Sequence, residues 1–390
     1  IKSNSTRIYQ EKQEDLTKTD LYSDITGKKY SLIAEGIYEK KISKGTLTGG
    51  IRHIQSYTNN QYLGNDVMDV ILKQAESYAY AEYKGKIQNW GYMANVAFNR
   101  FYYSQKDNRS ERYGLQPSFL VSYDPIDNLH FRYHINLKNN APSIAHLNDV
   151  EQSIDNLQIR RGNPALKSFR STIQDFNAVF NAGICSIDAL VSYSYEKNPI
   201  MESVLYEEGT FIHTYENQKS FQHLAAEVTF KIKPWKEYIS LSVTPGISRY
   251  ISTGNNYLHT YTLKELRINL DASYKNWLLS FMTITPPNRY VYGEQLMKGE
   301  LMHTLMIGYK QPAWSVMAGV HNPFMKTYRS ENENWSALNP VKSDIHSTNM
   351  SNTFVVKVNF NLNFGRQYKS ANKTIQNMDT DSGILQGTKD

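Results

Sequence analysis

The chain has 390 residues, of which 40% are hydrophobic, 21% are charged and 29 are tyrosine. Disorder is excluded because it requires few aromatic residues and a high net charge, and the single cysteine excludes a disulfide framework and a cysteine-based zinc site. A net charge of +6 is too small to indicate nucleic-acid binding, and no run of about 18 apolar residues is present to form a transmembrane helix.

A membrane-spanning β-barrel is compatible with this composition, because its strands need only every second residue to be apolar. The chain starts at Ile1 without a basic and apolar leader, so we expect a mature or excised segment. Residues 1–366 are predicted to form one β-barrel unit. Residues 367–390 are predicted to form a flexible C-terminal tail.

Strict alternation of apolar and polar residues recurs along the chain. It is clearest in residues 128–138, where Leu129, Phe131 and Tyr133 alternate with His130, Arg132 and His134. The same pattern returns in residues 226–233, 265–274 and 353–364. A period of two is typical of strands with one apolar and one polar face. Short helical candidates are confined to residues 66–75 and 143–157.

Connections between the predicted strands alternate between short and long. Short turns are expected near residues 43–45, 84–86, 123–127, 182–184, 233–236, 275–277 and 311–313. Long polar connections are expected at residues 57–69, 104–112, 139–167, 198–217 and 322–351. This arrangement predicts about 16 consecutive antiparallel strands, with short turns at one end and long external loops at the other, as in bacterial outer-membrane barrels.

A soluble β-sandwich or propeller would also alternate. Two features favour a transmembrane antiparallel up-and-down β-barrel. The predicted strands run for about 10 to 16 residues, whereas soluble strands average about 5–6, and charged residues occupy the polar face in mid-strand. Tyrosines gather near the predicted strand ends, as in an interfacial aromatic girdle. They are Tyr30, Tyr102, Tyr103, Tyr123, Tyr193, Tyr195, Tyr250, Tyr274 and Tyr309.

Several short motifs resemble those of one family in the same order. Residues 160–167 read R-R-G-N-P-A-L-K, and this segment resembles the G-N-P-x-L-K motif of the TonB-dependent-receptor-like outer-membrane barrels of Bacteroidetes. Residues 75–86, the segment L-Q-P-S-F at 115–119, the closing N-F-G-R at 363–366 and the tail M-D-T-D-S-G-I-L are also similar to that family. The similarity extends from about Leu32 to Phe364.

The resemblance implies a C-terminal portion of a larger, 22-stranded barrel with a plugged lumen. It implies a protein that imports a ferric siderophore, an oligosaccharide or a peptide. It also implies outer-membrane lipid or lipopolysaccharide as a partner of the barrel. The TonB complex would act through the missing plug domain, and a surface lipoprotein lid is a further implied partner. The alternatives are a passive porin-like or structural outer-membrane barrel, and a soluble β protein that binds glycans.

Charged and histidine side chains on the polar faces are predicted to face the lumen. They are His130, Arg132, His134, Lys138, Glu227, Lys231, Glu265, Arg267, Asp271 and Lys357. They either contact a plug or line a hydrated wall, and the hydrated wall is favoured for any one of them. His130 and His134 are about 13 Å apart on one strand, so no metal site is expected there.

The remaining candidates lie in turns and loops. Gly162, Asn163 and Pro164 form a turn motif, and the adjacent Arg160 and Arg161 either bind an anion or, as we favour, fix the loop. Cys185 has no catalytic partner in a compact motif, so no enzyme activity, cofactor or metal is expected. Ligand contacts or loop packing are equally expected for the loop aromatics. These are Tyr57, Tyr62, Tyr206, Tyr215, Tyr328 and Trp335.

Overall fold

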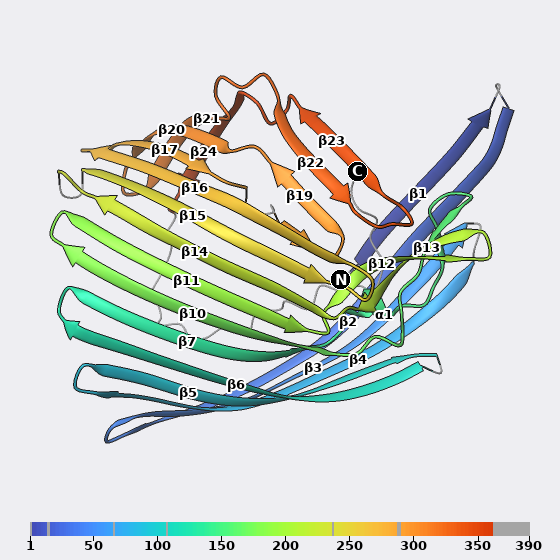
Figure 1. Ribbon diagram of the computed structural model, residues 1–390, viewed down its shortest axis with the longest axis horizontal. Helices are drawn as coiled ribbons and strands as arrows, with labels where there is room; N and C mark the ends of the chain where they lie inside the picture. Colours follow the sequence, from blue (N-terminus) through green and yellow to red (C-terminus); the bar gives the residue numbers. More distant parts are fainter. Residues whose placement is uncertain are drawn as a thin grey trace.

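The computed structural model describes residues 2–13, 16–64, 67–106, 108–235, 238–286 and 290–361. Its largest element is one 16-stranded sheet in the order β1-β2-β3-β4-β5-β6-β7-β10-β11-β14-β15-β16-β17-β20-β21-β24. Each neighbouring pair is antiparallel, and the strands follow one another side by side across the sheet (Figure 1). The all-β, antiparallel prediction of about 16 strands is confirmed.

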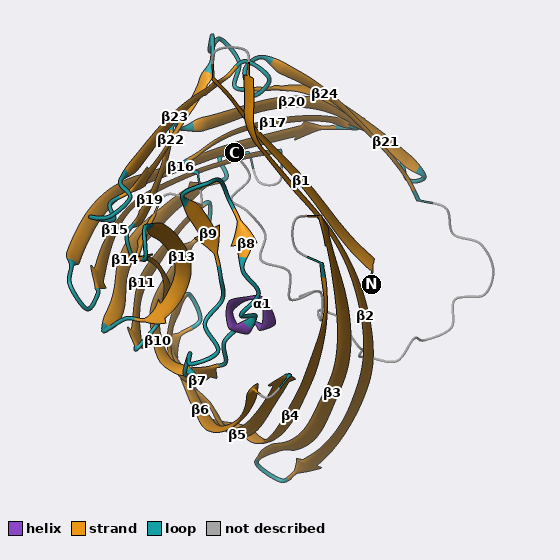
Figure 2. Ribbon diagram, turned by 90° about the vertical axis from the view of Figure 1, so that its right-hand side faces the viewer, coloured by secondary structure: helices purple, strands orange, loops and turns teal. Residues whose placement is uncertain are grey.

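The longest strands of this sheet lie near its N-terminal edge. Their bounds are β1 Lys2–Gln13, β2 Leu16–Ile42, β3 Gly45–Gly64, β4 Met68–Ile87, β5 Trp90–Gln105, β6 Asn108–Ile126, β7 Leu129–Asn140, β10 Phe169–Ala182, β11 Cys185–Lys197, β14 Ser220–Ile232, β15 Ile239–Thr253, β16 Leu258–Tyr274, β17 Trp277–Ile284, β20 Met302–Lys310, β21 Trp314–His321 and β24 Thr353–Phe360. The sheet is strongly curved (Figure 2), and no ladder joins β1 to β24 within the described ranges. The described part of the chain is therefore an open sheet and does not close into a barrel.

Two expected long connections are wrong. Residues 57–69 and 104–112 are mostly strand, because β3 runs to Gly64, β4 starts at Met68, β5 ends at Gln105 and β6 starts at Asn108. The polar Asn and Tyr side chains of these segments suggested loops. Their backbone groups instead continue the antiparallel ladder, and Ser56, Thr58 and Asn60 are buried on one face of it. The turn expected at residues 84–86 also lies a few residues later, between β4 and β5.

The sheet has two chemically different faces. Its concave face is the one against which residues 141–168 pack, inside the curve that Figure 2 shows. The convex face carries exposed and half-exposed apolar side chains in register from strand to strand. One row runs through Phe354, Val320, Leu305, Phe281, Leu270, Leu241 and Ile232. Exposed apolar rows of this length mark a surface that faces lipid.

Aromatic residues border the convex face at the end with short turns. Trp90 stacks on Tyr123 with ring centroids 4.2 Å apart, and Trp277 and Trp314 each contact the ring of Tyr309. From this border the apolar face of β16 rises through Tyr274 to Leu266, about 27 Å along the strand. Because strands of outer-membrane barrels are tilted by about 35–45°, this length corresponds to a height of about 19–22 Å, slightly less than their ~25 Å apolar band.

Two of the expected girdle tyrosines lie on the other face. Tyr103 is buried against residues 141–168, and Tyr250 stacks on His223 with ring centroids 4.3 Å apart. Neighbouring residues of a strand point to opposite faces of the sheet. A shift of one residue therefore decides whether a tyrosine faces lipid or the interior. Position near a strand end therefore did not suffice to assign them to the girdle.

Eight further strands form two small sheets at the end with long connections. The first loop sheet has the order β12-β13-β9-β8 and the second loop sheet has the order β18-β19-β22-β23. Their bounds are β8 Gln152–Ser153, β9 Gln158–Arg160, β12 Ile200–Glu207, β13 Thr210–Asn217, β18 Tyr290–Tyr292, β19 Gln295–Gly299, β22 Tyr328–Asn334 and β23 Val341–Ser347. Six of these strands, all but β18 and β19, fall in the long connections expected at residues 139–167, 198–217 and 322–351, and neither small sheet was predicted.

Of the two helical candidates, only a part of one is a helix. α1 spans Ile144–Leu147, and Ser143 caps it by accepting a hydrogen bond from the backbone N–H of His146. The other candidate, residues 66–75, falls mostly on β4, where Val70 and Leu72 point to the same buried side at a spacing of two. No helix among the described residues is long and apolar enough to span a membrane. The predicted tail, residues 367–390, and the end of the predicted last strand lie outside the described residues.

Candidate functional site

The connection between β7 and β10 folds back into the concave side of the sheet. We call residues 141–168 the mouth loop. Its Ile144, Leu147, Val150 and Leu166 form one apolar cluster with side chains of the long N-terminal strands. The cluster members from these strands and from β12 are Ile25, Tyr62, Val70, Leu72, Phe101, Tyr103 and Ile200. The mouth loop therefore covers part of the interior at the end with long connections.

A chain of buried polar contacts fastens the mouth loop to β3 and β5. Asn148 donates from Nδ2 to the hydroxyl of Tyr62 at 3.0 Å. Gln105 donates from Nε2 to Asn148 Oδ1 and to Asp149 Oδ1, both at 2.9 Å, and the Tyr103 hydroxyl donates to Gln105 Oε1 at 2.5 Å. Because buried polar groups are costly when unpaired, this network favours one seating of the loop.

The motif Gly162-Asn163-Pro164 closes the mouth loop onto itself and onto β13. The backbone N–H of Gly162 donates to the Asn148 carbonyl at 2.9 Å. A side chain at Gly162 would overlap with the Asn148 carbonyl oxygen and come within 2.7 Å of the His146 carbonyl oxygen. Asn163 donates from Nδ2 to the Tyr215 carbonyl and accepts from the Ala165 N–H, each at 2.9 Å. Glycine is needed here because two backbone segments approach closely.

Two arginines near the motif are held in ion pairs or hydrogen bonds with the loop. Arg161 contacts Glu151 at 2.9 Å and Glu207 of β12 at 3.5 Å. Arg112 of β6 donates to the carbonyl of Leu166. The contacts of Arg161 agree with the structural role favoured for it from sequence, since both of its carboxylate partners belong to the loop and the first loop sheet.

A cavity of about 890 Å³ lies beside the motif. Its wall combines cationic and acidic residues (Lys106, Arg161, Asp149, Glu151), the motif itself and apolar residues including Met68, Ile159 and Leu205. Its size is within the range of small-molecule sites, which is about 300–1,000 Å³. The mixed wall suits a polar ligand with both donor and acceptor groups.

The two loop sheets are joined by polar contacts. His213 Nε2 lies 2.9 Å from Gln158 Oε1 and 3.3 Å from Asn339 Nδ2. Gln295 donates to Glu202 at 3.1 Å. Burial lowers the pKa of His213 and raises the pKa of Glu202, while Arg160 opposes the latter shift. Both groups therefore tend toward their neutral forms inside this contact.

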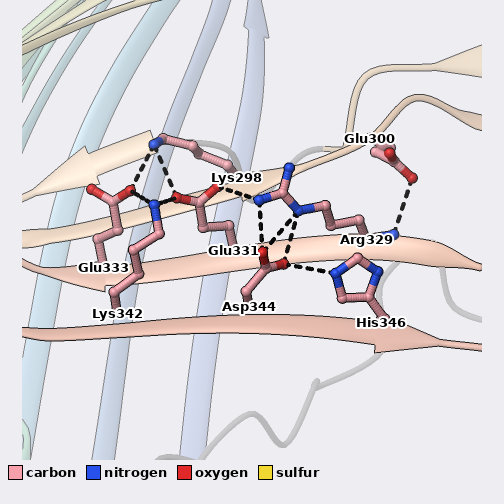
Figure 3. A network of polar contacts seen from close by, with 8 residues as sticks. All are labelled: Lys298, Glu300, Arg329, Glu331, Glu333, Lys342, Asp344 and His346. Carbon is pink, nitrogen blue, oxygen red and sulfur yellow. Dashed lines mark hydrogen bonds and ion pairs between the residues drawn. The ribbon is translucent and has the colours of Figure 1, made fainter.

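The second loop sheet carries an ion-pair network across β19, β22 and β23 (Figure 3). Lys298 lies 2.8 Å from Glu333 and 3.5 Å from Glu331. Lys342 lies 2.5 Å from Glu331 and 3.4 Å from Glu333. Arg329 holds Asp344 in a bidentate pair at 2.8 and 2.7 Å. Hydrogen bonds with Glu331, Lys298 and Trp335 lower the pKa of Glu333 to about 2, and the pair with Arg329 lowers the pKa of Asp344.

The six aromatic residues expected to contact ligand have different environments. Tyr57 lies within β3 rather than in a loop and is 38% exposed, and Tyr206 is 57% exposed on the β12–β13 hairpin beside Phe211. Tyr62 and Tyr328 are buried. Tyr215 stacks on His146 at 3.9 Å, and Trp335 donates to Glu333 and contacts the His259 ring. We call the mouth loop and the two loop sheets together the mouth. Four of the six aromatic residues thus pack within the mouth, and Tyr206 is the exposed one there.

All ten polar-face residues from the sequence lie on the concave face by ladder register. Arg267 of β16 reaches Glu227 of β14 at 3.0 Å, across β15. This contact is possible because Gly246 stands between Glu227 and Glu265 on β15 without a side chain. Glu265 accepts from Ser248 at 2.5 Å, and Asp271 accepts from Ser280 at 2.8 Å.

The histidines of β7 are paired separately. His130 Nδ1 lies 3.0 Å from Asp124, whereas His134 contacts Ser118 at 3.1 Å and Asp175 at 3.9 Å. Arg132, Lys138 and Lys357 are exposed on the concave side, and Lys231 is half-buried there. No cluster of three or more His, Cys, Asp or Glu with metal-site geometry occurs among the described residues.

Sequence reasoning missed most of the residues that build the mouth. Tyr103 was expected in the girdle, and Gln105, Asn148 and Asp149 were not singled out. Their shared signal is weak, because single polar residues at strand ends are common. The available signal was the Gly162-Asn163-Pro164 motif, whose backbone partners are the loop residues around Asn148.

Comparison with known proteins agrees with this architecture. A model of the family described as "outer membrane protein beta-barrel family" matches residues 2–285. No curated protein matches the sequence.

Solved structures of similar shape are transporters and receptors by name. The FrpB iron transporter from Neisseria meningitidis (F3-3 variant) has a TM-score of 0.57 and 12% identity over 88% of this chain and 61% of its own. The copper transporter OprC has a TM-score of 0.62 and 12% identity over 92% of this chain and 61% of its own. The siderophore receptor PirA from Pseudomonas aeruginosa has a TM-score of 0.54 and 13% identity over 93% of this chain and 71% of its own. This chain therefore spans 61% of the length of the first two, and the likeness concerns the fold.

Proposed function

This chain belongs to the outer membrane protein β-barrel family, and from that premise we propose that it is the barrel of a TonB-dependent receptor that imports a large nutrient. The observation that carries the proposal is the mouth. A loop anchored by buried polar contacts and two loop sheets stand over a polar concave wall, and they leave a cavity of about 890 Å³ beside the Gly162-Asn163-Pro164 motif.

In this proposal the ligand is captured at the mouth and released along the concave face. The cavity wall offers Lys106 and Arg161 to anionic groups and Asp149 and Glu151 to hydroxyl or amide donors. These groups suit a ferric siderophore, an oligosaccharide or a peptide. The concave-face residues, including Arg267 and Glu227, would contact a plug domain, which would receive energy from the TonB complex. A surface lipoprotein lid would close the mouth.

Growth on defined nutrients tests the function. Strains with the gene intact, deleted or restored are grown with a ferric catecholate siderophore as the iron source, a maltooligosaccharide as the carbon source or a peptide digest as the nitrogen source. We expect deletion to remove growth on one of these classes, and removal of TonB to have the same effect.

The second candidate is a passive porin-like barrel, which the polar concave face also supports. It predicts uptake that depends on the gene but persists without TonB, and a steady ion conductance of the purified protein in planar bilayers. Either result would overturn the receptor proposal. A soluble glycan-binding protein is no longer a candidate, because the family lies in the outer membrane.

A further inference from the structure

The outer half of β6 has an edge that no described strand covers. The ladder between β6 and β7 runs only from the pair Ser118–Asn136 to the pair Ile126–Leu129. β6 itself extends outward to Asn108 and pairs with β5 along this whole length, whereas the described end of β7 pairs with β10 alone. We call residues 109–117 of β6 the outer edge.

The ladder between β6 and β7 ends at Pro117 for a chemical reason. Successive residues of an antiparallel strand direct their backbone groups alternately to one neighbour and to the other. The Asp124 N–H donates to the Asn89 carbonyl next to β5 at 2.9 Å, so the even-numbered residues of β6 face β5 and the odd-numbered residues face away. Pro117 would be the next residue to donate to β7, and proline has no N–H.

Gly114 shows in which direction β7 leaves the sheet. A Cβ at Gly114 would overlap with Asn99 Oδ1 and Asn139 Nδ2, and it would lie 2.6 Å from Asn139 Cβ. Gly114 shares a side of β6 with Arg112, which donates to the mouth loop on the concave side. Asn139 therefore lies over the concave side of β6, and the end of β7 turns inward instead of continuing beside the outer edge.

The outward backbone groups of the outer edge have no hydrogen-bond partner among the described residues. Each of Arg109, Glu111, Tyr113 and Leu115 presents an N–H and a carbonyl there. The apolar convex side of β6 runs from Tyr123 to Leu115, about 27 Å along the strand, so the groups beyond Leu115 stand above the apolar band. Unpaired backbone groups are costly in hydrocarbon and are tolerated in water.

A cavity of about 490 Å³ lies on the concave side at the place where β6 and β7 part. Gln116 donates from Nε2 to the Asn139 carbonyl at 3.3 Å, and both residues line the cavity. Asn99 is only 6% exposed in this wall, and its Oδ1 has no hydrogen-bond partner within the described ranges; the same is true of Arg52 Nε. The wall therefore holds one acceptor and one donor that are not used by the protein itself.

We propose that the outer edge captures the nutrient as an extended peptide, which adds to β6 as a further strand. The inference rests on the proposed import function and selects the peptide from its three ligand classes. A polypeptide backbone repeats donors and acceptors at the spacing of a strand, whereas sugars and siderophores do not. Side chains on the concave side of the peptide meet the cavity, where Asn99 and Arg52 offer their unused groups.

The charge of the outer edge favours one kind of peptide. Arg109 is exposed and forms no ion pair in the part of the chain that the structure describes, whereas Glu111 is paired with Arg100 at 2.5 Å. Oppositely charged side chains on neighbouring strands attract each other. An acidic side chain beside Arg109 is therefore favoured.

Two substitutions at one position separate the backbone from the side chain. Tyr113→Pro removes an outward N–H but leaves the groups that face β5, because residue 113 does not donate to β5. Tyr113→Ala removes the same side chain and keeps the N–H, so it is the matched control. Heat-modifiable migration on gels verifies that each variant is folded.

Binding is measured with the purified protein in detergent. A tryptic digest of casein is the probe, its retained peptides are identified by mass spectrometry, and the tightest one is synthesised with a fluorescent label. We expect fluorescence polarisation to show binding at least about tenfold weaker in Tyr113→Pro and changed by less than about twofold in Tyr113→Ala. Parent affinity in Tyr113→Pro, equal losses in both variants, or a digest from which the parent retains no peptide would overturn the proposal.

Methylation of the peptide backbone tests the parent protein alone. The nitrogens of an added strand face β6 at every second residue and face away at the others. We expect N-methyl groups at one alternate set to abolish binding and at the other set to leave it unchanged; tolerance at every position or at none would overturn strand addition. If these tests fail while TonB-dependent growth on the siderophore or maltooligosaccharide is observed, the import function stands without this site.

Discussion

Gly162 controls how the mouth loop is seated. Its N–H donates to the Asn148 carbonyl, and the space where a side chain would stand is occupied by backbone atoms of His146 and Asn148. Backbone atoms cannot turn aside as the end of a flexible side chain can. The motif recognised in the sequence therefore has a physical reason, which is the close packing of two backbone segments of one loop.

Gly162→Ala should loosen the mouth loop without unfolding the sheet. Overpacking of this kind costs about 1–3 kcal/mol, so amides of residues 144–166 should exchange with deuterium faster than in the parent. Gly36→Ala is the control, because its Cβ would make only an ordinary 3.7 Å contact with Ile51. Unchanged exchange in Gly162→Ala would show that the loop accommodates a methyl group and that the close packing is unimportant.

Tyr206 and Tyr62 separate ligand contact from loop packing. Tyr206 is 57% exposed at the mouth, and its replacement by alanine should weaken binding of the transported nutrient by about tenfold or more if it is a recognition aromatic. Tyr62→Phe removes the acceptor of Asn148 and should destabilise the loop by about 1 kcal/mol. Titration of the nutrient against both variants, with deuterium exchange on each, distinguishes the roles. Parent affinity in Tyr206→Ala would remove Tyr206 from the proposed site.

At the level of elements, the second loop sheet is held together by charge. Lys298, Glu331, Glu333 and Lys342 form alternating contacts between three strands. Individual exposed ion pairs contribute little, and networks with good geometry contribute more. Here the two glutamates are only 12% and 15% exposed in their side chains, so the network is protected from water on one side.

The network predicts a pH dependence for this sheet. The pKa of Glu333 is lowered from 4.5 to about 2, and that of Asp344 is lowered by Arg329. Their contribution to stability is therefore complete above pH ~4.5 and is lost as the pH falls toward ~2. Hydrogen exchange of residues 328–347, corrected for the intrinsic rate, should be slow at pH 5 and fast near pH 2.5.

The hairpin β12–β13 serves as the internal control for this pH series in a His213→Gln variant. His213 has a lowered pKa and would weaken the hairpin when protonated, whereas Glu202 has a raised pKa there. A folded-state pKa above the ordinary value predicts that protonation of Glu202 does not weaken the hairpin as the pH falls. Equal acceleration of exchange in both loop sheets would contradict a specific role of the Glu331–Glu333 network.

Elements with one lipid-facing side were predictable from sequence, and the mouth was not. The alternation in β7, β14 and β16 follows from lipid on one side and water on the other, so each strand carries its own signal. The ends of β3 and β5 lack that signal, because beyond the membrane their outer faces become polar while Tyr62 and Tyr103 turn inward against the mouth loop. Their burial depends on residues about 40 to 85 positions away, and no local period reports such contacts.

At the level of the whole molecule, one curved sheet separates lipid from a polar interior. The apolar rows of the convex face continue from strand to strand, while concave side chains such as Glu227 and Arg267 pair across strands. Lipid on the convex side and polar contents on the concave side account for both patterns. The receptor proposal and the interpretation of the mouth both depend on this assignment of faces.

Spin labels along β14 test that assignment most directly. In a Cys185→Ser background, single cysteines at positions 226 to 231 are labelled in the protein reconstituted in lipid, and their accessibility to oxygen and to a nickel chelate is measured. We predict high oxygen accessibility at Ala226, Val228 and Phe230, and lower oxygen accessibility at Glu227, Thr229 and Lys231. Accessibility to the nickel chelate should be detected, if at all, only at Glu227, Thr229 and Lys231. A uniform profile, or the reverse alternation, would contradict the membrane barrel and everything built on it.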